Sequence, residues 1–334
     1  QIVAWAVWIP LTYTLEIVRE LGSLSWASFQ VNFAGSTAGL IYAGLLILML
    51  LKIQHPDDRA HLARRLRQQI TPSLVVLAGG IVAFLVWAVA LTQPDRELHV
   101  WFLDVGHGQG VLVRTPDGAH LLVDGGPNPT QLRQAVGDVM PFWNRTLDLL
   151  IFSQPERSAI GGLPELVRHY DVRLALSNGQ PGDDAEFAEL VENLADQGTE
   201  VMSVIAGHRI VTNDGVTIEV LHPQALPLPT DESDTSSLVI RISYGNTSFL
   251  LGPDLSVEGE RELVESGWFI GSTVVMLPAH GRAKENSLEF LQAVRPQAAV
   301  ALVGAGNRAG LPDREVVERV SALTGRSLFR TDKH

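Results

Sequence analysis

The stretch FLDVGHGQGVLVRTPDGAHLLVDGG, residues Phe102 to Gly126, decides the fold of the C-terminal part of the chain. Around it lie three short apolar strand patterns, at residues 99–106, 110–115 and 120–126. Pro116-Asp117-Gly118 separates the last two, and glycine permits the positive φ that a tight turn needs. The stretch therefore predicts a β-hairpin at the start of a folded domain.

Strand and helix patterns alternate downstream of this hairpin. Helical patterns cover residues 129–139, 162–169 and 185–197. Strand patterns cover residues 174–176, 208–211, 217–222, 237–243 and 247–251, and the alternation continues from Glu258 to the end. Groups of strands followed by helices, twice over, predict an α/β domain in which two sheets pack face to face with helices outside.

The first 96 residues differ from the rest in their apolar content. Residues 31–52 and 71–93 are each long and apolar enough to span about 30 Å of hydrocarbon as a helix. Residues 2–18 form a shorter apolar stretch, either the end of another span or a helix at the membrane interface. The sequence predicts a membrane region at 1–96 and a soluble domain at 97–334, in a multi-pass protein of the plasma membrane.

Charge also separates the two regions. Residues 97–334 carry 18 Lys/Arg and 32 Asp/Glu, a net charge of −14, whereas residues 1–96 carry seven and five. The segment between the two spans, residues 52–69, is rich in arginine, which is typical of a cytoplasmic loop. That orientation predicts an extracytoplasmic soluble domain, and the acidic charge of this domain disfavours general binding of nucleic acid.

Several chemistries are excluded by what the chain lacks. It has no cysteine, so a metal would need histidine and carboxylate ligands. It has neither a GxxxxGK[ST] loop nor a GxSxG elbow, which argues against a nucleotide-driven motor and a serine hydrolase. Because it begins with Gln1 instead of methionine, we expect a fragment of a longer chain. Four histidines are expected at ordinary surface or strand positions: His107, His120, His208 and His222.

Six motifs in a fixed order resemble those of a known family. They are Phe102 to Gly126, Ile151 to Leu163, Ser233 to Asp254, Pro278 to Arg282, Val303 to Pro312 and Arg330 to Asp332. With the apolar segments in front of them, these motifs resemble the C-terminal part of ComEC, the bacterial competence membrane protein of DNA uptake. The resemblance implies a metallo-β-lactamase-like αββα sandwich attached to a membrane channel domain, with the competence machinery as partner.

The metal-binding loop of that family reads approximately S-H-x-H-x-D-H-x-G-G. Imidazoles and a carboxylate at such spacing converge on one or two divalent ions, which lower the pKa of a bound water. The corresponding residues here, Ser153 to Gly162, read SQPERSAIGG. Both ends of the motif are retained, but Gln154 is a poor ligand, Ala159 is none, and Arg157 adds a positive charge. The resemblance therefore implies a pseudoenzyme without a resident metal cofactor.

The distal motifs T-G-D, H-H-G and G-H-P of the family appear as Gly252-Pro253-Asp254, Ala279-His280-Gly281 and Gly310-Leu311-Pro312. Asp254 and His280 are the candidate metal ligands that remain, and they fall short of the three protein ligands of a catalytic zinc site. Asp104, Asp124 and Glu156 are the catalytic candidates. Asp124 is followed by two glycines, so it is equally suited to hold a turn.

Three functions stay open at this point. The first is a ComEC-like DNA-uptake protein whose soluble domain serves a structural or DNA-binding role. The second is an active metal-dependent hydrolase, a phosphodiesterase or nuclease, with zinc or manganese held by Glu156, Asp254 and His280. The third is a membrane-tethered scaffold that binds another protein, which the acidic charge favours. Four basic residues near the motifs are candidates for contacts with DNA: Arg282, Lys284, Arg308 and Arg314.

Overall fold

The computed structural model describes residues 95–141, 144–226, 237–325 and 328–333. They fall within one compact unit of the chain, Gln93–His334. The three predicted membrane segments at 2–18, 31–52 and 71–93 lie outside the described residues, so the membrane region stays a prediction. In the ranges that are described, no helix combines the length and the apolar character needed to cross a bilayer.

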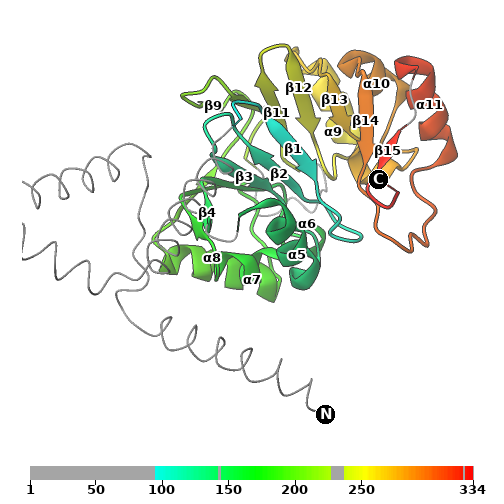
Figure 1. Cartoon of the computed structure of the whole chain (residues 1–334). Helices are drawn as coiled ribbons and strands as arrows, with labels where there is room; N and C mark the ends of the chain where they lie inside the picture. Colours follow the sequence, from blue (N-terminus) through cyan, green and yellow to red (C-terminus); the bar gives the residue numbers. More distant parts are fainter. Residues whose placement is uncertain (1–94, 142–143, 227–236, 326–327, 334) are drawn as a thin grey trace, which may run out of the picture. The chain divides into compact units, whose positions relative to one another are not determined.

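The first sheet of the described chain has six strands in the order β1-β2-β3-β5-β7-β8. The neighbouring strands β1, β2 and β3 can be followed in Figure 1. These strands are β1 (His99–Phe102), β2 (Val111–Arg114), β3 (His120–Val123), β5 (Leu149–Phe152), β7 (Leu174–Ser177) and β8 (Glu200–Ser203). β1, β2 and β3 are antiparallel, whereas β3, β5, β7 and β8 run parallel. The predicted hairpin is confirmed, with Gly118 at φ +90° donating its N–H to the Thr115 carbonyl oxygen at 2.8 Å.

The second sheet has seven described strands in the order β15-β14-β13-β12-β11-β10-β9. These are β9 (Arg209–Val211), β10 (Thr217–His222), β11 (Val239–Tyr244), β12 (Thr247–Leu251), β13 (Val274–Met276), β14 (Ala298–Ala301) and β15 (Phe329–Arg330). β9 to β12 are antiparallel, and β12 to β15 are parallel. β4 (Thr146–Leu147) and β6 (Asp171–Val172) form a separate parallel pair.

Helices follow the parallel strands of each sheet. With the first sheet go α5 (Pro129–Val139), α6 (Arg157–Ile160), α7 (Leu163–Val167) and α8 (Ala185–Asp196). With the second go α9 (Val257–Glu265), the 3₁₀ helix η2 (Pro278–Gly281), α10 (Leu288–Val294) and α11 (Arg314–Thr324). Asn128 caps α5 by accepting hydrogen bonds from the backbone N–H groups of Thr130 and Gln131, which satisfies two donors that a helix start leaves open.

Three apolar clusters define the layers. The central cluster joins residues of both sheets, such as Val113 and Leu121 from the first and Ile218 and Ile240 from the second. A second cluster packs α5, α7 and α8 on the outer face of the first sheet, and a third packs α9, α10 and α11 on the outer face of the second. The domain is therefore the αββα sandwich that the sequence predicted.

Several local predictions differ from the structure. The buried strand β5 and the short pair β4 and β6 were not predicted. The helix predicted at 162–169 is observed as α7, and the separate helical turn α6 that precedes it was not predicted. β8 is absent from the prediction because all four of its residues are exposed at a sheet edge. An exposed edge strand has no alternation of apolar and polar residues by which to recognise it.

Candidate functional site

The predicted site residues follow the carboxyl ends of parallel strands. Asp124 comes directly after β3, Ser153 and Gln154 directly after β5, and Asp254 three residues after β12. Ligand sites of α/β proteins gather at this edge because the loops that leave parallel strands converge there. The two sheets meet at the same edge, since the Gln154 side chain of the first sheet reaches Asp254 of the second.

Asp254 is held by two glutamine amides. The Nε2 atom of Gln109 donates to Oδ1 at 2.8 Å, and the Nε2 atom of Gln154 donates to Oδ2 at 2.6 Å. Both glutamines are buried, with exposed fractions of 2% and 9%. Hydrogen bonds to an ionised carboxylate are short and strong. Each carboxylate oxygen thus already has a donor in the place where the related motif would supply a metal.

Asp124 is a fully buried carboxyl group that joins β3 to β5. It accepts hydrogen bonds from the backbone N–H and the hydroxyl of Ser153 at 2.8 and 2.9 Å. Burial and, to a smaller extent, the charges of Asp254 and Glu156 together raise the pKa of Asp124 to about 8, although the hydrogen bonds from Ser153 act to lower it. The group is mostly protonated at pH 7. Its contacts cross between strands, and Asp124 itself has a positive φ of +56° directly before the two glycines that follow it.

His280 occupies a strained turn in η2. Ala279 and His280 have φ angles of +46° and +58°, a region that side chains other than glycine seldom adopt. The Nδ1 atom of His280 lies 2.7 Å from the Leu302 carbonyl oxygen, which can only accept. Nδ1 therefore carries the proton, and the lone pair of a neutral ring lies on Nε2. That tautomer is compatible with a metal-ligating role.

The donor set at this edge nevertheless does not fit a zinc ion. Within the described ranges, one group of three His, Asp or Glu side chains brings its ligand atoms within 4.8 Å of one another, and it consists of Asp95, Glu97 and His99. Glu156, Asp254 and His280 therefore do not converge in that way. The Asp95 cluster lies at β1, where its carboxylate already pairs with His99 at 2.6 Å and with Arg114 at 3.1 Å.

Asp104 lies apart from the other candidates. It is exposed and accepts a hydrogen bond from the Gly106 N–H at 3.2 Å. It lines a cavity of about 430 Å³ between β1 and α5, together with Trp101, Gln131 and Asp138. None of the residues that line this cavity is another of the predicted site residues. The structure thus brings Asp124 and Asp254 into one neighbourhood with Glu156, and leaves Asp104 outside it.

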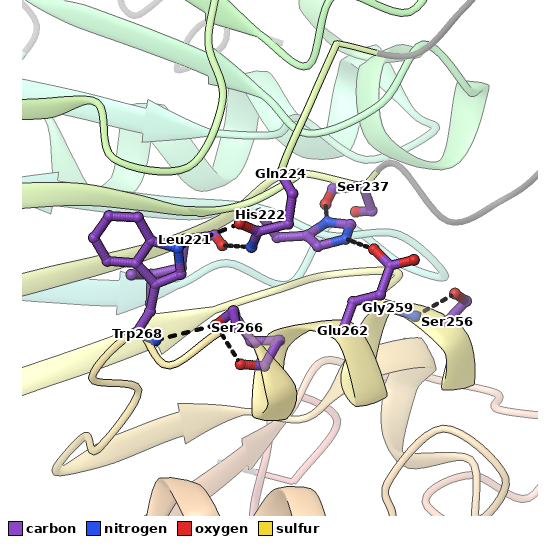
Figure 2. A network of polar contacts seen from close by, with 10 residues as sticks. Leu221, His222, Gln224, Ser237, Ser256, Gly259, Glu262, Ser266 and Trp268 are labelled. Atoms are coloured by element: carbon purple, nitrogen blue, oxygen red, sulfur yellow. Dashed lines mark hydrogen bonds and ion pairs between the residues drawn. The ribbon is translucent and has the colours of Figure 1, made fainter.

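His222 is a buried polar residue at the end of β10, as the sequence predicted for a strand position. Figure 2 shows its ring between Ser237 and Glu262, with Nδ1 at 2.9 Å from the Ser237 carbonyl oxygen and Nε2 at 3.4 Å from the Glu262 carboxylate. It joins β10 to α9, and an exposed pair, Trp268 and Gln224, whose side chains form a hydrogen bond at 3.3 Å, belongs to the same group of polar contacts (Figure 2). Its contacts are those of a residue that fastens two elements together.

The sequence analysis missed the role of Gln109 and Gln154. Gln154 was noted as a poor ligand in the place of a metal-ligating residue, and the pairing of its amide and that of Gln109 with one carboxylate was not foreseen. The signal was present in the sequence, since two amides replace groups that would converge on one ion. Amide N–H groups at those positions can satisfy a retained carboxylate in place of the cation.

Several solved structures are similar to this chain in fold, at low sequence identity. YhfI of Bacillus subtilis, a metallo-β-lactamase fold protein, is 12% identical with a TM-score of 0.47, over 70% of this chain and 97% of that one. Zn²⁺-bound PqqB of Methylobacterium extorquens is 12% identical with a TM-score of 0.44, over 67% of this chain and 84% of that one. The αββα assignment stands on the strand order and the packed layers of this chain itself.

No protein-family model matches the chain. "Competence protein ComA" of Neisseria gonorrhoeae is 32% identical over 264 residues, which are 79% of this chain and 34% of that protein. "ComE operon protein 3" of Bacillus subtilis is 27% identical over 287 residues, 78% of this chain and 35% of that protein. The chain thus spans about a third of the length of these relatives. The resemblance predicted from the motifs is confirmed, and over 79% of its residues the chain is homologous to competence proteins of the ComEC family.

Proposed function

We propose that the chain is the C-terminal part of a ComEC-like plasma-membrane protein of DNA uptake, in which the αββα domain has lost metal-dependent hydrolysis. The domain then serves a structural or DNA-binding role. Support for the competence part comes from the two relatives, whose names refer to competence and to the ComE operon. Support for the loss of hydrolysis comes from one observation, the bonding of Gln109 and Gln154 to Asp254.

This observation bears on chemistry because water must be activated for hydrolysis at neutral pH. A divalent ion does so by lowering the pKa of a bound water, and it needs electron-pair donors from the protein. The two glutamines present N–H groups to Asp254, and Asp124 is mostly protonated at pH 7. An N–H group and a protonated carboxyl are poor ligands. On this proposal, the donors around Asp254 take the place of such an ion at this edge.

A DNA-binding role is supported by the position of the basic residues. The Asp313 N–H donates to the Gly281 carbonyl oxygen at 2.9 Å, and the Ala283 N–H donates to the Asp313 carboxylate at 2.7 Å. These bonds join two loops that are about 30 residues apart in sequence. The joined loops carry four exposed basic side chains, Arg282, Lys284, Arg308 and Arg314. A local basic surface of this kind can contact phosphates although the domain as a whole is acidic.

The test of lost hydrolysis measures the metal content and the phosphodiesterase activity of the purified full chain in detergent. We expect neither stoichiometric zinc or manganese nor cleavage of DNA. Stoichiometric metal together with cleavage would refute the proposal. The DNA-binding role is tested with single-stranded DNA at increasing salt, where affinity should fall steeply and should fall further in Arg282→Ala. The exposed Arg133 on α5 supplies the control variant, Arg133→Ala, which should bind as the unchanged chain does.

A second candidate, the active hydrolase with an altered ligand set, is favoured by a different observation. Asp254 and Glu156 both raise the pKa of Asp124, so three carboxyl groups share one neighbourhood. His280 in addition presents the lone pair of Nε2. If this candidate holds, Asp254→Asn should abolish cleavage of a phosphodiester substrate. An unchanged rate in Asp254→Asn would count against the altered ligand set and favour a contaminant as the source of activity.

A further inference from the structure

A second group of buried acceptors lies at the start of α9, outside the edge described above. Seven buried side-chain atoms have no hydrogen-bond partner in the described part of the chain, and three of them come from Glu260, Glu285 and Asn286. All three are oxygen atoms: Oε1 of Glu260, Oε2 of Glu285 and Oδ1 of Asn286. Glu260 is 2% exposed and Asn286 is fully buried. Unpartnered buried oxygens cost free energy unless a ligand satisfies them.

Contacts between α9 and the segment 285–287 bring these groups together. The Oε2 atom of Glu260 accepts a hydrogen bond from the backbone N–H of Ser287 at 3.2 Å. Glu285 and Asn286 directly precede Ser287, and the charge of Glu285 acts on the Glu260 carboxyl group. The Oε1 atom of Glu260 is therefore the oxygen left over on a carboxylate that already touches this segment.

The orientation of the Asn286 amide is fixed by its neighbours. Its Nδ2 atom donates to the carbonyl oxygens of Pro278 and Arg282 at 2.9 and 2.8 Å. Carbonyl oxygens can only accept, so the nitrogen must face them and the amide cannot be turned round. The Oδ1 atom thus points away from those carbonyls with no donor of its own.

Electrostatics excludes a simple pairing with the nearest cation. Arg319 lies close enough to lower the pKa of Glu260, but its Nη1 atom donates to the carbonyl oxygens of Ala283 and Asn286 and its Nη2 atom pairs with Glu315. Burial nevertheless raises the pKa of Glu260 to about 7, and Glu285 adds to the rise. The carboxylates of Glu260 and the half-buried Glu285 repel each other, and the charge of Arg319 acts against this repulsion while its N–H groups bond to Ala283, Asn286 and Glu315.

We propose that Glu260, Glu285 and Asn286 bind a calcium ion. Calcium takes six to eight oxygen ligands in flexible geometry, including carboxylates, amide carbonyls and waters. Magnesium demands a stricter octahedron and keeps most of its water, which suits a half-buried oxygen cluster less well. The ion neutralises both carboxylates and uses the three oxygens that lack donors. The ion also joins the start of α9 to the segment that follows the His280 turn. Asp254 is not among its ligands, so this proposal does not depend on the proposed function.

The experiment measures calcium binding by the full chain in detergent after treatment with EDTA, by titration calorimetry and by thermal unfolding. We expect one calcium ion per chain, and a rise in Tm of roughly 5 °C at saturating calcium. Magnesium at the same concentration should produce a smaller rise. The absence of calcium binding by the unchanged chain would overturn the proposal.

Variants locate the bound ion. Glu260→Gln should abolish the calcium-dependent rise in Tm while it raises the Tm of the calcium-free protein, because a buried charge is removed. If Glu260 had only a structural role, Glu260→Gln would not both abolish the calcium-dependent rise in Tm and raise the Tm of the calcium-free protein. Glu285→Gln, at a half-buried position, should weaken binding about tenfold or more and provides the test if Glu260→Gln does not fold. Glu258→Gln on the exposed face of the same helix, and Asp254→Asn, should bind as the unchanged chain does. Unaltered binding in Glu260→Gln or Glu285→Gln would place the ion elsewhere and reject the site.

Discussion

Asp254 and Glu260 lie six residues apart in the chain, and their carboxyl groups, the first half-buried and the second buried, have different hydrogen-bond partners. Asp254 accepts an amide N–H on each of its two oxygens, from Gln109 and Gln154. Glu260 interacts with both the backbone N–H and the side chain of Ser287, and its Oε1 atom has no partner among the described hydrogen bonds. The first carboxylate is therefore satisfied by the protein itself, and the second is not.

The difference shows that a buried carboxylate does not by itself indicate an ion site. What decides is whether the surrounding side chains present donors or acceptors to it. Around Asp254 they present N–H groups, which compete with a cation for the same lone pairs. Near Glu260, the segment 285–287 carries the oxygens of Glu285 and Asn286 that lack donors, which the proposed calcium ion would use. Under the two proposals, one domain lacks an ion at one buried carboxylate and holds one at another, which is consistent with sites varying independently of folds.

The largest expected effect concerns the proton on Asp124, next to Asp254. Its pKa in the folded chain is about 8, against 3.8 for the ordinary group. Between these values the folded state keeps a proton that the unfolded state has lost, so this group makes stability fall as pH rises from about 4 to 8. The slope approaches about 1.4 kcal/mol per pH unit. Asp124→Asn should remove that part of the pH dependence in denaturant unfolding of the full chain.

The exposed Asp196 at the end of α8 supplies the control, because Asp196→Asn should leave the pH profile as it is. An ion bound at Asp254 would stabilise the ionised form of Asp124, and the difference between the unchanged chain and Asp124→Asn would then vanish. Identical pH profiles would therefore contradict the picture of an Asp254 cluster that holds a proton in place of a metal.

The fold could be predicted from the sequence more completely than the site, for a physical reason. Layer order follows from the hydrophobic patterns of strands such as β2 and β3 and from helices that follow parallel strands, and these patterns act locally. The residues of the site come from loops that the fold brings together, so the pairing of Gln109 with Asp254 across 145 residues has no local pattern. Chemical type still helped, since replacement of the ligands in SQPERSAIGG directed attention to this edge, whose role as a site stays a prediction.

Two strands show where local sequence patterns are sufficient for prediction, and Glu260 shows where they fail. β10 and β12 were found at nearly their observed bounds because their residues alternate or are continuously apolar. The cluster at Glu260 was not foreseen at all. Glu260 lies in an acidic first turn of a helix, which ordinarily indicates favourable interaction with the helix dipole and an exposed position. Its burial follows from the packing of α9 against the segment 285–287, which sequence periodicity does not reveal.

A smaller effect is expected when one donor to Asp254 is removed. Gln154→Leu leaves one oxygen of a half-buried carboxylate without its amide, and a hydrogen bond to a charged group contributes about 1.5–3 kcal/mol. We expect the free energy of unfolding, measured with denaturant, to fall by about 2 kcal/mol. In an Asp254→Ala background, Gln154→Leu should lower the free energy of unfolding by much less. The difference between the two backgrounds separates the loss of the hydrogen bond from the loss of packing. Gln134→Leu, at an exposed position of α5, is the control and should have little effect.

The smallest expected effect tests most directly whether Asp254 and Glu260 behave independently of each other. Ser256 lies between Asp254 and Glu260, and its hydroxyl accepts a hydrogen bond from the Gly259 N–H at 3.1 Å, which caps α9 (Figure 2). Ser256→Ala removes that cap at a cost of about 1 kcal/mol and loosens the helical turn that carries Glu260. The glutamine bonds to Asp254 do not involve α9, so the pH profile set by Asp124 should stay unchanged while calcium binds several-fold more weakly. Ser256→Asn keeps a capping side chain and should restore both stability and binding. If Ser256→Ala shifted the Asp124 profile as well, the two carboxylates would belong to one coupled cluster, and the contrast between them would fail.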